Sequence, residues 1–205
     1  MSHLSAVVAT HQSRDHQGGL PAVLEEIPTD LYVDGGDGNT DPAFLAIART
    51  AARRGVRRVV PRQGDVLHAP GLTVRVLGPP PRPPGPPPED PNPRALATVV
   101  SSHGFDLFLS GDAESGSLLP LPLPDVEAMK VSHHGSRDPG LPMLLRRLRP
   151  EVAGIEVGAA NTYGHPAPPT IAALRRAVPH VYRTDRDGTV TVRAGARGLE
   201  VETER

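Results

Sequence analysis

The chain has 205 residues, 38% of them hydrophobic, and a formal net charge of −1 at pH 7. This length allows one sizeable core, and we expect one domain over residues 1–205. The absence of cysteine excludes disulfides, iron–sulfur clusters and thiol catalysis, so any metal must be held by His, Asp, Glu or backbone oxygen. The near-zero charge gives no global basic field for nucleic acid. No apolar run reaches the ~20 residues of a membrane span and no secretory signal opens the chain, so we expect a soluble, cytoplasmic chain.

The first predicted element is a buried strand in the apolar run that begins at Ala6. A polar loop follows it, carries His11, Asp15 and His16, and ends at Gly18 and Gly19. Imidazole nitrogens and a carboxylate at one strand end are ligands that suit Zn²⁺ or Mn²⁺. The alternative is that these histidines only cap backbone groups of the turn.

Short helices and strands alternate through the rest of the chain. Apolar residues at helical spacing predict helices over 19–26, 42–54, 139–148 and 169–178. Apolar or alternating runs predict strands over 30–34, 57–61, 72–77, 95–101, 105–110, 126–132, 152–157, 181–183 and 189–193. Asp41 and Pro42 mark the start of the second helix. The dipeptide Asp187–Gly188 predicts a tight hairpin between the last two strands.

Residues 79–93 contain ten of the 25 prolines. Each proline removes a backbone donor and fixes φ, so neither a helix nor a central strand can cross this segment. The elements on both sides are short and rich in strands. We therefore expect a long surface loop within one domain instead of a boundary between two domains.

Polar residues also follow three later strands. Asp112 comes after the strand over 105–110, and the strands over 126–132 and 152–157 are followed by His133, His134, Asn161, Tyr163 and His165. In an alternating α/β pattern such strand ends converge on one edge of the sheet, where these folds place their sites. For Asp112 alone, capping of a following helix is the alternative role.

Five segments of the chain carry a family resemblance. They are THQSRDHQGGL (10–20), LFLSGDAE (107–114), MKVSHHGS (129–136), GAANTYGHP (158–166) and YRTDRDG (182–188). In order and spacing they resemble the metallo-β-lactamase superfamily, and most closely the metallo-β-lactamase-like domain of ComEC-type DNA-uptake (competence) proteins. The resemblance covers essentially the whole chain. It implies an α/β fold, the αβ/βα sandwich in which two sheets pack face to face with helices outside.

The resemblance also implies a metal site. One metal position would use His11 and one residue of the pair His133 and His134. Only one of that pair should enter the site, because adjacent residues on an extended strand end point to opposite sides. The other position would be made of Asp15, His16, Asp112 and His165, with Asp112 as the bridging carboxylate.

Two departures from the family pattern bear on this site. Ser13 stands where the family has His or Asp, and a hydroxyl is a much poorer ligand at neutral pH. This weakens the position at His11, so we expect one divalent metal, Zn²⁺ or Mn²⁺, per chain. The family domain also begins with strands ahead of the first histidine loop, whereas this chain starts only ten residues before it. We therefore expect a domain that lacks its first N-terminal strands, which a neighbouring polypeptide could supply.

The closest resemblance implies that the substrate is DNA and that the chain works with a membrane DNA-uptake channel. Hydrolysis of a phosphodiester would use Asp15 as ligand and orienting base, with His165, His133 or His134 near the leaving oxygen. The candidate substrate-binding residues are Ser136, Asn161 and Tyr163, for which hydrogen bonds to loop backbone are the alternative. Two other interpretations stay open: a non-catalytic remnant or docking subunit, and a hydrolase of a lactone, thioester or β-lactam.

Overall fold

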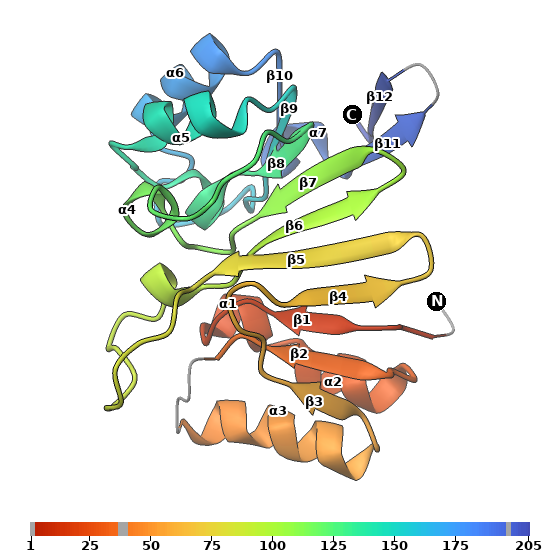
Figure 1. Cartoon of the computed structure of the whole chain (residues 1–205). Coiled ribbons are helices and arrows are strands. Elements are labelled where there is room, and N and C mark those ends of the chain that lie inside the picture. The colour runs from red at the N-terminus through yellow and green to blue at the C-terminus, as the bar shows by residue number, and fades with distance from the viewer. Residues whose placement is uncertain (1–2, 37–40, 196–197) are drawn as a thin grey trace.

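The computed structural model describes residues 3–36, 41–195 and 198–205 of the chain. In these residues the structure has a three-stranded sheet and a seven-stranded sheet, both covered by helices, and a two-stranded sheet near the C-terminus (Figure 1). Within the described ranges, no helix combines the length and apolar character needed to cross a membrane.

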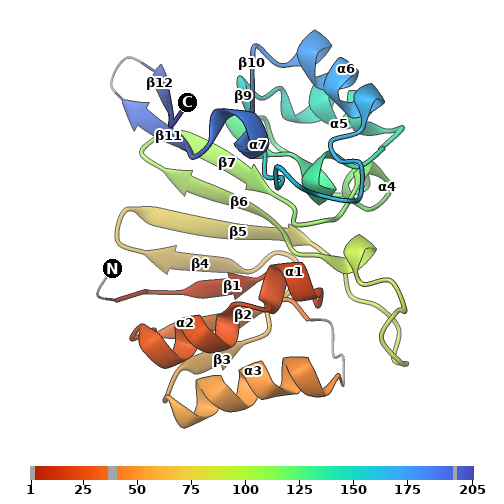
Figure 2. The ribbon, with the colours of Figure 1, turned by 180° about the vertical axis from the view of Figure 1, so that it is seen from behind.

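The smaller sheet holds the N-terminal part of the chain. It has three parallel strands in the order β1 (Val7–Ala9), β2 (Leu31–Asp34) and β3 (Arg57–Val59). The accompanying helices are α1 (Arg14–Gln17), α2 (Leu20–Glu26) and α3 (Pro42–Arg53). Tyr32 packs with Leu24 and Ile47 in a buried cluster where α2 and α3 cover this sheet (Figure 2). Asp41 accepts a hydrogen bond from the Ala43 backbone and caps α3 at the predicted start.

The larger sheet has the strand order β10-β9-β8-β7-β6-β5-β4. Its strands are β4 (Val66–Ala69), β5 (Leu72–Gly78), β6 (Ala97–Ser102), β7 (Phe105–Leu109), β8 (Ala128–Lys130), β9 (Val152–Ile155) and β10 (His180–Arg183). Strands β4 to β7 pair antiparallel, and β7 to β10 pair parallel. The parallel half brings the carboxyl ends of β7, β8 and β9 to one edge, together with the residues that follow them.

The main core lies between the larger sheet and its helices. These helices are α4 (Ser115–Leu118), α5 (Leu141–Leu148) and α6 (Pro168–Ala177). Val99, Phe108, Met129 and Ala153 are cross-strand neighbours, so their side chains share one face, and all four are buried in this core. This packing fixes the strands whose ends carry the later polar loops.

A smaller cluster joins the two sheets. Val33 of β2 is buried against Val76 of β5 and against Leu96, which precedes β6. Successive side chains of a strand point to opposite faces, so Val33 faces the larger sheet while Tyr32 faces α2 and α3. Each sheet thus has the other sheet on one face and helices on its outer face, and the predicted α/β class is confirmed. That the domain lacks its first N-terminal strands stays a prediction.

The hairpin predicted around Asp187–Gly188 is wrong. β10 pairs in parallel with β9, and α7 (Thr184–Asp187) follows it. The Asp187 carboxylate accepts a hydrogen bond from the Arg183 backbone N–H, which stabilises this short helix. The hairpin instead joins β11 (Val190–Gly195) to β12 (Gly198–Thr203).

Residues 79–91 form neither helix nor strand, as their prolines predict, and η1 (Asn92–Arg94) follows them. Arg82 and Arg94 donate side-chain hydrogen bonds to the carbonyls of Pro83 and Pro80. These bonds satisfy carbonyl groups in a segment where proline removes the backbone donors. A further short helix, η2 (Ser132–Gly135), replaces the end of the strand predicted over 126–132.

Candidate metal centre

The loop after β1 carries the first part of the site. His11 is buried, and its Nδ1 lies 3.1 Å from the Thr10 hydroxyl. The Gln17 side chain donates a hydrogen bond to the His11 carbonyl over 2.7 Å. Both contacts fix the histidine, and the one at Nδ1 leaves Nε2 to face the site. α1 follows immediately and carries Asp15 and His16.

Asp112 lies at the centre of the site, just beyond the end of β7. Its Oδ1 lies 3.0 Å from His16 Nε2 and 3.8 Å from His134 Nε2. Its Oδ2 lies 3.9 Å from His11 Nε2 and 3.7 Å from His133 Nε2. Each oxygen of this buried carboxylate therefore faces a different pair of histidines. The residue at the N-cap position of α4 is Glu114, so Asp112 does not take the capping role that was its alternative.

Gly111 lets β7 end close to the loop after β1. Its φ is +53°, in the left-handed region, and a Cβ atom there would lie 2.8 Å from Oγ1 of Thr10. Glycine is the residue that adopts this φ without steric cost. Glycine at position 111 thus allows Asp112, which follows a strand of the larger sheet, to approach His11.

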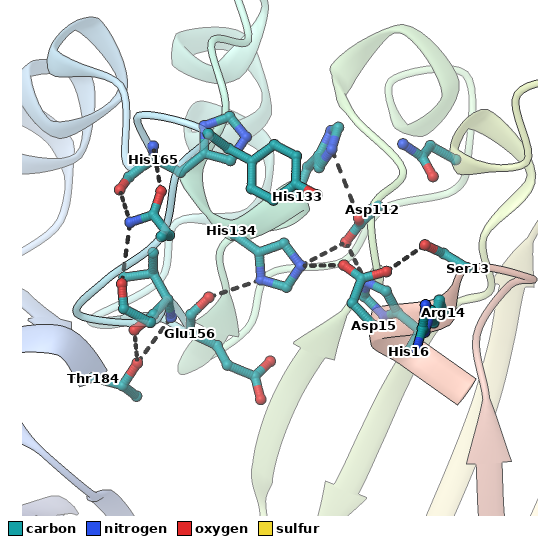
Figure 3. Close-up of a pocket in the computed structure, with 15 residues that line it drawn as sticks. Ser13, Arg14, Asp15, His16, Asp112, His133, His134, Glu156, His165 and Thr184 are labelled. Carbon is teal, nitrogen blue, oxygen red and sulfur yellow. Dashed lines mark hydrogen bonds and ion pairs between the residues drawn. The ribbon is translucent and has the colours of Figure 1, made fainter. Parts of the chain in front are cut away.

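His133 and His134 both point to Asp112 (Figure 3). Nδ1 of His133 lies 3.0 Å from Oε1 of Glu114, and Nδ1 of His134 lies 2.8 Å from the Glu156 carbonyl oxygen. These contacts leave Nε2 of each ring for the site. The expectation that only one of the two enters is wrong, because it assumed an extended backbone. Both residues are left-handed, with φ values of 48° and 51°.

Ser13 orients Asp15. Its hydroxyl donates a short hydrogen bond to Oδ1 of Asp15, while Oδ2 lies 3.7 Å from His16 Nε2 and 3.5 Å from His134 Nε2 (Figure 3). Burial raises the pKa of the Asp15 carboxyl, but the Ser13 hydrogen bond and the nearby His16 ring outweigh burial and lower it below its ordinary value. Ser13 thus supports the neighbouring ligand candidate Asp15.

Four of these residues fit a divalent cation. One ligand atom from each of Asp15, His16, Asp112 and His134 lies within 4.8 Å of the other three. In the described ranges, the buried atoms without a hydrogen-bond partner include Nε2 of His11, His16 and His134 and Oδ1 of Asp112. Unpaired buried polar atoms cost free energy, and one cation would satisfy several of them. Imidazole and carboxylate ligands suit Zn²⁺ or Mn²⁺.

The protonation states of the site also favour a cation. Burial, together with the neighbouring His16, lowers the pKa of His11 to about 4. Burial raises the pKa of Asp112, but contact with His16 and the proximity of His134 and His133 outweigh burial and lower it to about 2. At neutral pH a neutral imidazole therefore stands beside an ionised carboxylate, which are the forms that bind metal.

His165 lies across a cavity of about 980 Å³ that opens over the site (Figure 3). Its ring centroid is 5.7 Å from that of His133, and it is not part of the four-residue group. The sequence interpretation placed His165 with Asp15, His16 and Asp112, whereas the structure brings His134 to them. Burial, followed by the nearby His133 and His134, lowers the pKa of His165. Its role as a ligand or catalytic residue stays a prediction.

The three predicted substrate-binding residues have different surroundings. Ser136 is buried and donates to the Glu114 side chain, which is neither a substrate contact nor the predicted bond to loop backbone, and its role in substrate binding stays a prediction. Asn161 lines the cavity and bonds twice to the His165 backbone. Tyr163 lines the cavity and is exposed. Glu114 itself was not predicted, although its place two residues after Asp112 in LFLSGDAE was an available signal.

Two curated proteins match the sequence over nearly its whole length. ComE operon protein 3 of Bacillus subtilis is 28% identical over 197 residues, which are 94% of this chain and 25% of the relative. Recombination protein 2 of Haemophilus influenzae is 24% identical over 204 residues, which are 98% of this chain and 24% of the relative. This chain is a distant homologue of both. It spans about a quarter of their length, and the predicted resemblance to ComEC-type proteins is confirmed. No protein-family model matches the sequence.

Solved structures share the fold at low sequence identity. A protein of Parabacteroides distasonis described as a metal-dependent hydrolase aligns with a TM-score of 0.52 at 12% identity, over 89% of this chain and 77% of its own. The CmlA β-hydroxylase aligns with a TM-score of 0.56 at 10% identity, over 89% of this chain and 43% of its own.

Proposed function

We propose that this chain is a metal-dependent hydrolase that cleaves phosphodiester bonds of DNA. The group of Asp15, His16, Asp112 and His134 at the floor of an open cavity carries the proposal, because it fits one cation and leaves room for a substrate. The distant homology to ComE operon protein 3 and Recombination protein 2 supports DNA as the substrate. It also supports a membrane DNA-uptake channel as the working partner.

Side chains around the cavity can accept a proton, contact the leaving oxygen and bind the phosphate. A bound divalent cation would polarise a phosphoryl oxygen and lower the pKa of water. Asp15, whose side chain is 58% exposed, is ionised, is oriented by Ser13 and can accept a proton from water in the cavity. His165 stands across the cavity, where its neutral ring can donate a hydrogen bond to the leaving oxygen. Arg14 also lines the cavity and offers positive charge to the phosphate.

The test is cleavage of single-stranded DNA with added Mn²⁺ or Zn²⁺, alongside a lactone and a β-lactam substrate. Asp15→Ala and His165→Ala should each lower cleavage at least about 100-fold, the range for loss of a proton acceptor or of a hydrogen-bond donor to the developing charge. His180→Gln, which changes an exposed histidine of β10, is the matched control and should cleave normally. DNA binding should be weak and fall with salt, because the net charge is only −1.

Two results would contradict the proposal. Hydrolysis of the lactone or β-lactam without DNA cleavage would assign the site to another substrate class. Metal binding without hydrolysis of any substrate, also in a version extended upstream, would favour the non-catalytic docking subunit.

A further inference from the structure

Tyr163 has an unusual position for an aromatic side chain. It is 84% exposed, whereas the next most exposed large apolar residue in the described part of the chain, Val60, is 55% exposed. The other described Phe and Tyr side chains are buried or half-buried. Leaving an aromatic ring in water forgoes the stabilisation that burial would give. Because this ring also lines the cavity over the metal centre, its exposure calls for a ligand.

The loop holds the tyrosine in a defined orientation. Asn161 donates to the His165 carbonyl over 2.9 Å and accepts from the His165 N–H over 3.1 Å, which closes the loop on both sides of Tyr163. The Tyr163 ring stacks on the His165 ring, with centroids 6.1 Å apart and planes 17° from parallel. The exposed ring is therefore supported from below and is a flat platform at the cavity wall.

A series of rings leads from this platform to the centre of the site. His165 stacks on Tyr163 and lies 5.7 Å from the His133 ring, and Nε2 of His133 lies 3.7 Å from Asp112. Two ring contacts, through His165, thus separate Tyr163 from His133, which lies next to the buried carboxylate. Arg14 lines the same cavity and can meet a phosphate.

We propose that Tyr163 stacks on an unpaired nucleobase of the DNA next to the bond that is cleaved, so that the site prefers single strands. This inference rests on the proposed function and names the form of its substrate. Every base has a π-face for stacking on an aromatic side chain, whereas a base within a duplex is already stacked and paired.

The test is binding to the metal-free full chain. A single-stranded oligothymidylate is compared with an abasic strand of equal length, by titration of tyrosine emission and of a label on the strand. The chain has no Trp, so its intrinsic emission comes from Tyr. Wild type should bind the base-bearing strand about 5- to 100-fold more tightly than the abasic strand, as expected for stacking of one base. Tyr163→Ala should lose this preference, and Tyr163→Phe should keep it.

Two controls separate stacking from a general effect. Met143→Ala removes another exposed apolar side chain, on α5 and outside the cavity lining, and should behave as wild type. Tyr163→Ala should bind a duplex of the same sequence, and hold metal, as well as wild type does.

Equal binding of base-bearing and abasic strands by wild type, or a preserved preference in Tyr163→Ala, would overturn the inference. Its failure differs from failure of the proposed function. Metal-dependent DNA cleavage without tighter binding of base-bearing strands would contradict only the stacking role of Tyr163. Tighter binding of base-bearing strands without cleavage of any phosphodiester would contradict only the proposed hydrolase activity.

Discussion

Asp112 connects the two halves of the site, because each of its oxygens faces a different pair of histidines. Asp112→Ala should therefore weaken binding of Zn²⁺ or Mn²⁺ by more than the roughly 100-fold that loss of a supporting residue can cause. His133→Ala should have a smaller effect, because His133 lies outside the four-residue group. Competition with a chromogenic chelator measures both affinities. Unchanged affinity of Asp112→Ala would leave the carboxylate with no role in metal binding.

His11 should make the stability of the metal-free protein depend on pH. Its pKa falls from 6.5 to about 4 on folding, chiefly through burial. The unfolded chain therefore binds the proton more readily, so this contribution is complete above pH 6.5 and is lost as the pH falls toward 4. At ~1.4 kcal/mol per pKa unit it amounts to a few kcal/mol.

Urea unfolding between pH 7 and 4.5, with a chelator present, measures this effect. His11→Gln should show a flatter fall in the free energy of unfolding than wild type, whereas His180→Gln, at an exposed position, should follow wild type. Parallel curves for wild type and His11→Gln would show that His11 does not titrate in this range.

At the scale of elements, the alternation of short strands and helices was readable from the sequence, and so was the gathering of polar loops at strand ends. The position of the C-terminal hairpin could not be read from the sequence. The Asp187 carboxylate accepts a hydrogen bond from the Arg183 backbone N–H and forms a short helix where local turn preferences predict a hairpin. The entry of both His133 and His134 depends on two left-handed residues, which the sequence SHHGS does not reveal. The strand β4 was not predicted: it is a short edge strand, and two of its four residues, Val66 and His68, are exposed, so the sequence has no apolar run there.

Gly111 offers a test of how β7 meets the loop after β1. Gly111→Ala should destabilise the protein by about 1–2 kcal/mol for the left-handed φ, and by about 1–3 kcal/mol more for the clash with Thr10. Gly55→Ala is the matched control, because Gly55 has a φ of +70° and open space around its Cβ position. Denaturant unfolding compares the two variants. Equal losses would show that the approach of Gly111 to Thr10 does not constrain the fold.

At the scale of the whole molecule, the site depends on both sheets. The loop after β1 supplies His11, Asp15 and His16 from the smaller sheet, and the strand ends of the larger sheet supply Asp112 and His134. The α/β class and these ligand candidates could be predicted from strand ends and family resemblance. The sequence could not predict that His134, and not His165, joins Asp15 and His16. The loop with Asn161 and Tyr163 holds His165 on the other side of the cavity, and this arrangement is defined only in the folded chain.

The central claim is that one divalent cation binds the group of Asp15, His16, Asp112 and His134, with Ser13 leaving the second position weak. The most direct measurement is elemental analysis of protein that has been loaded with Zn²⁺ or Mn²⁺ and then dialysed. We expect one equivalent per chain for wild type, one for His133→Ala, and much less than one for His134→Ala. Two equivalents that survive dialysis, or a full equivalent retained by His134→Ala, would contradict this account.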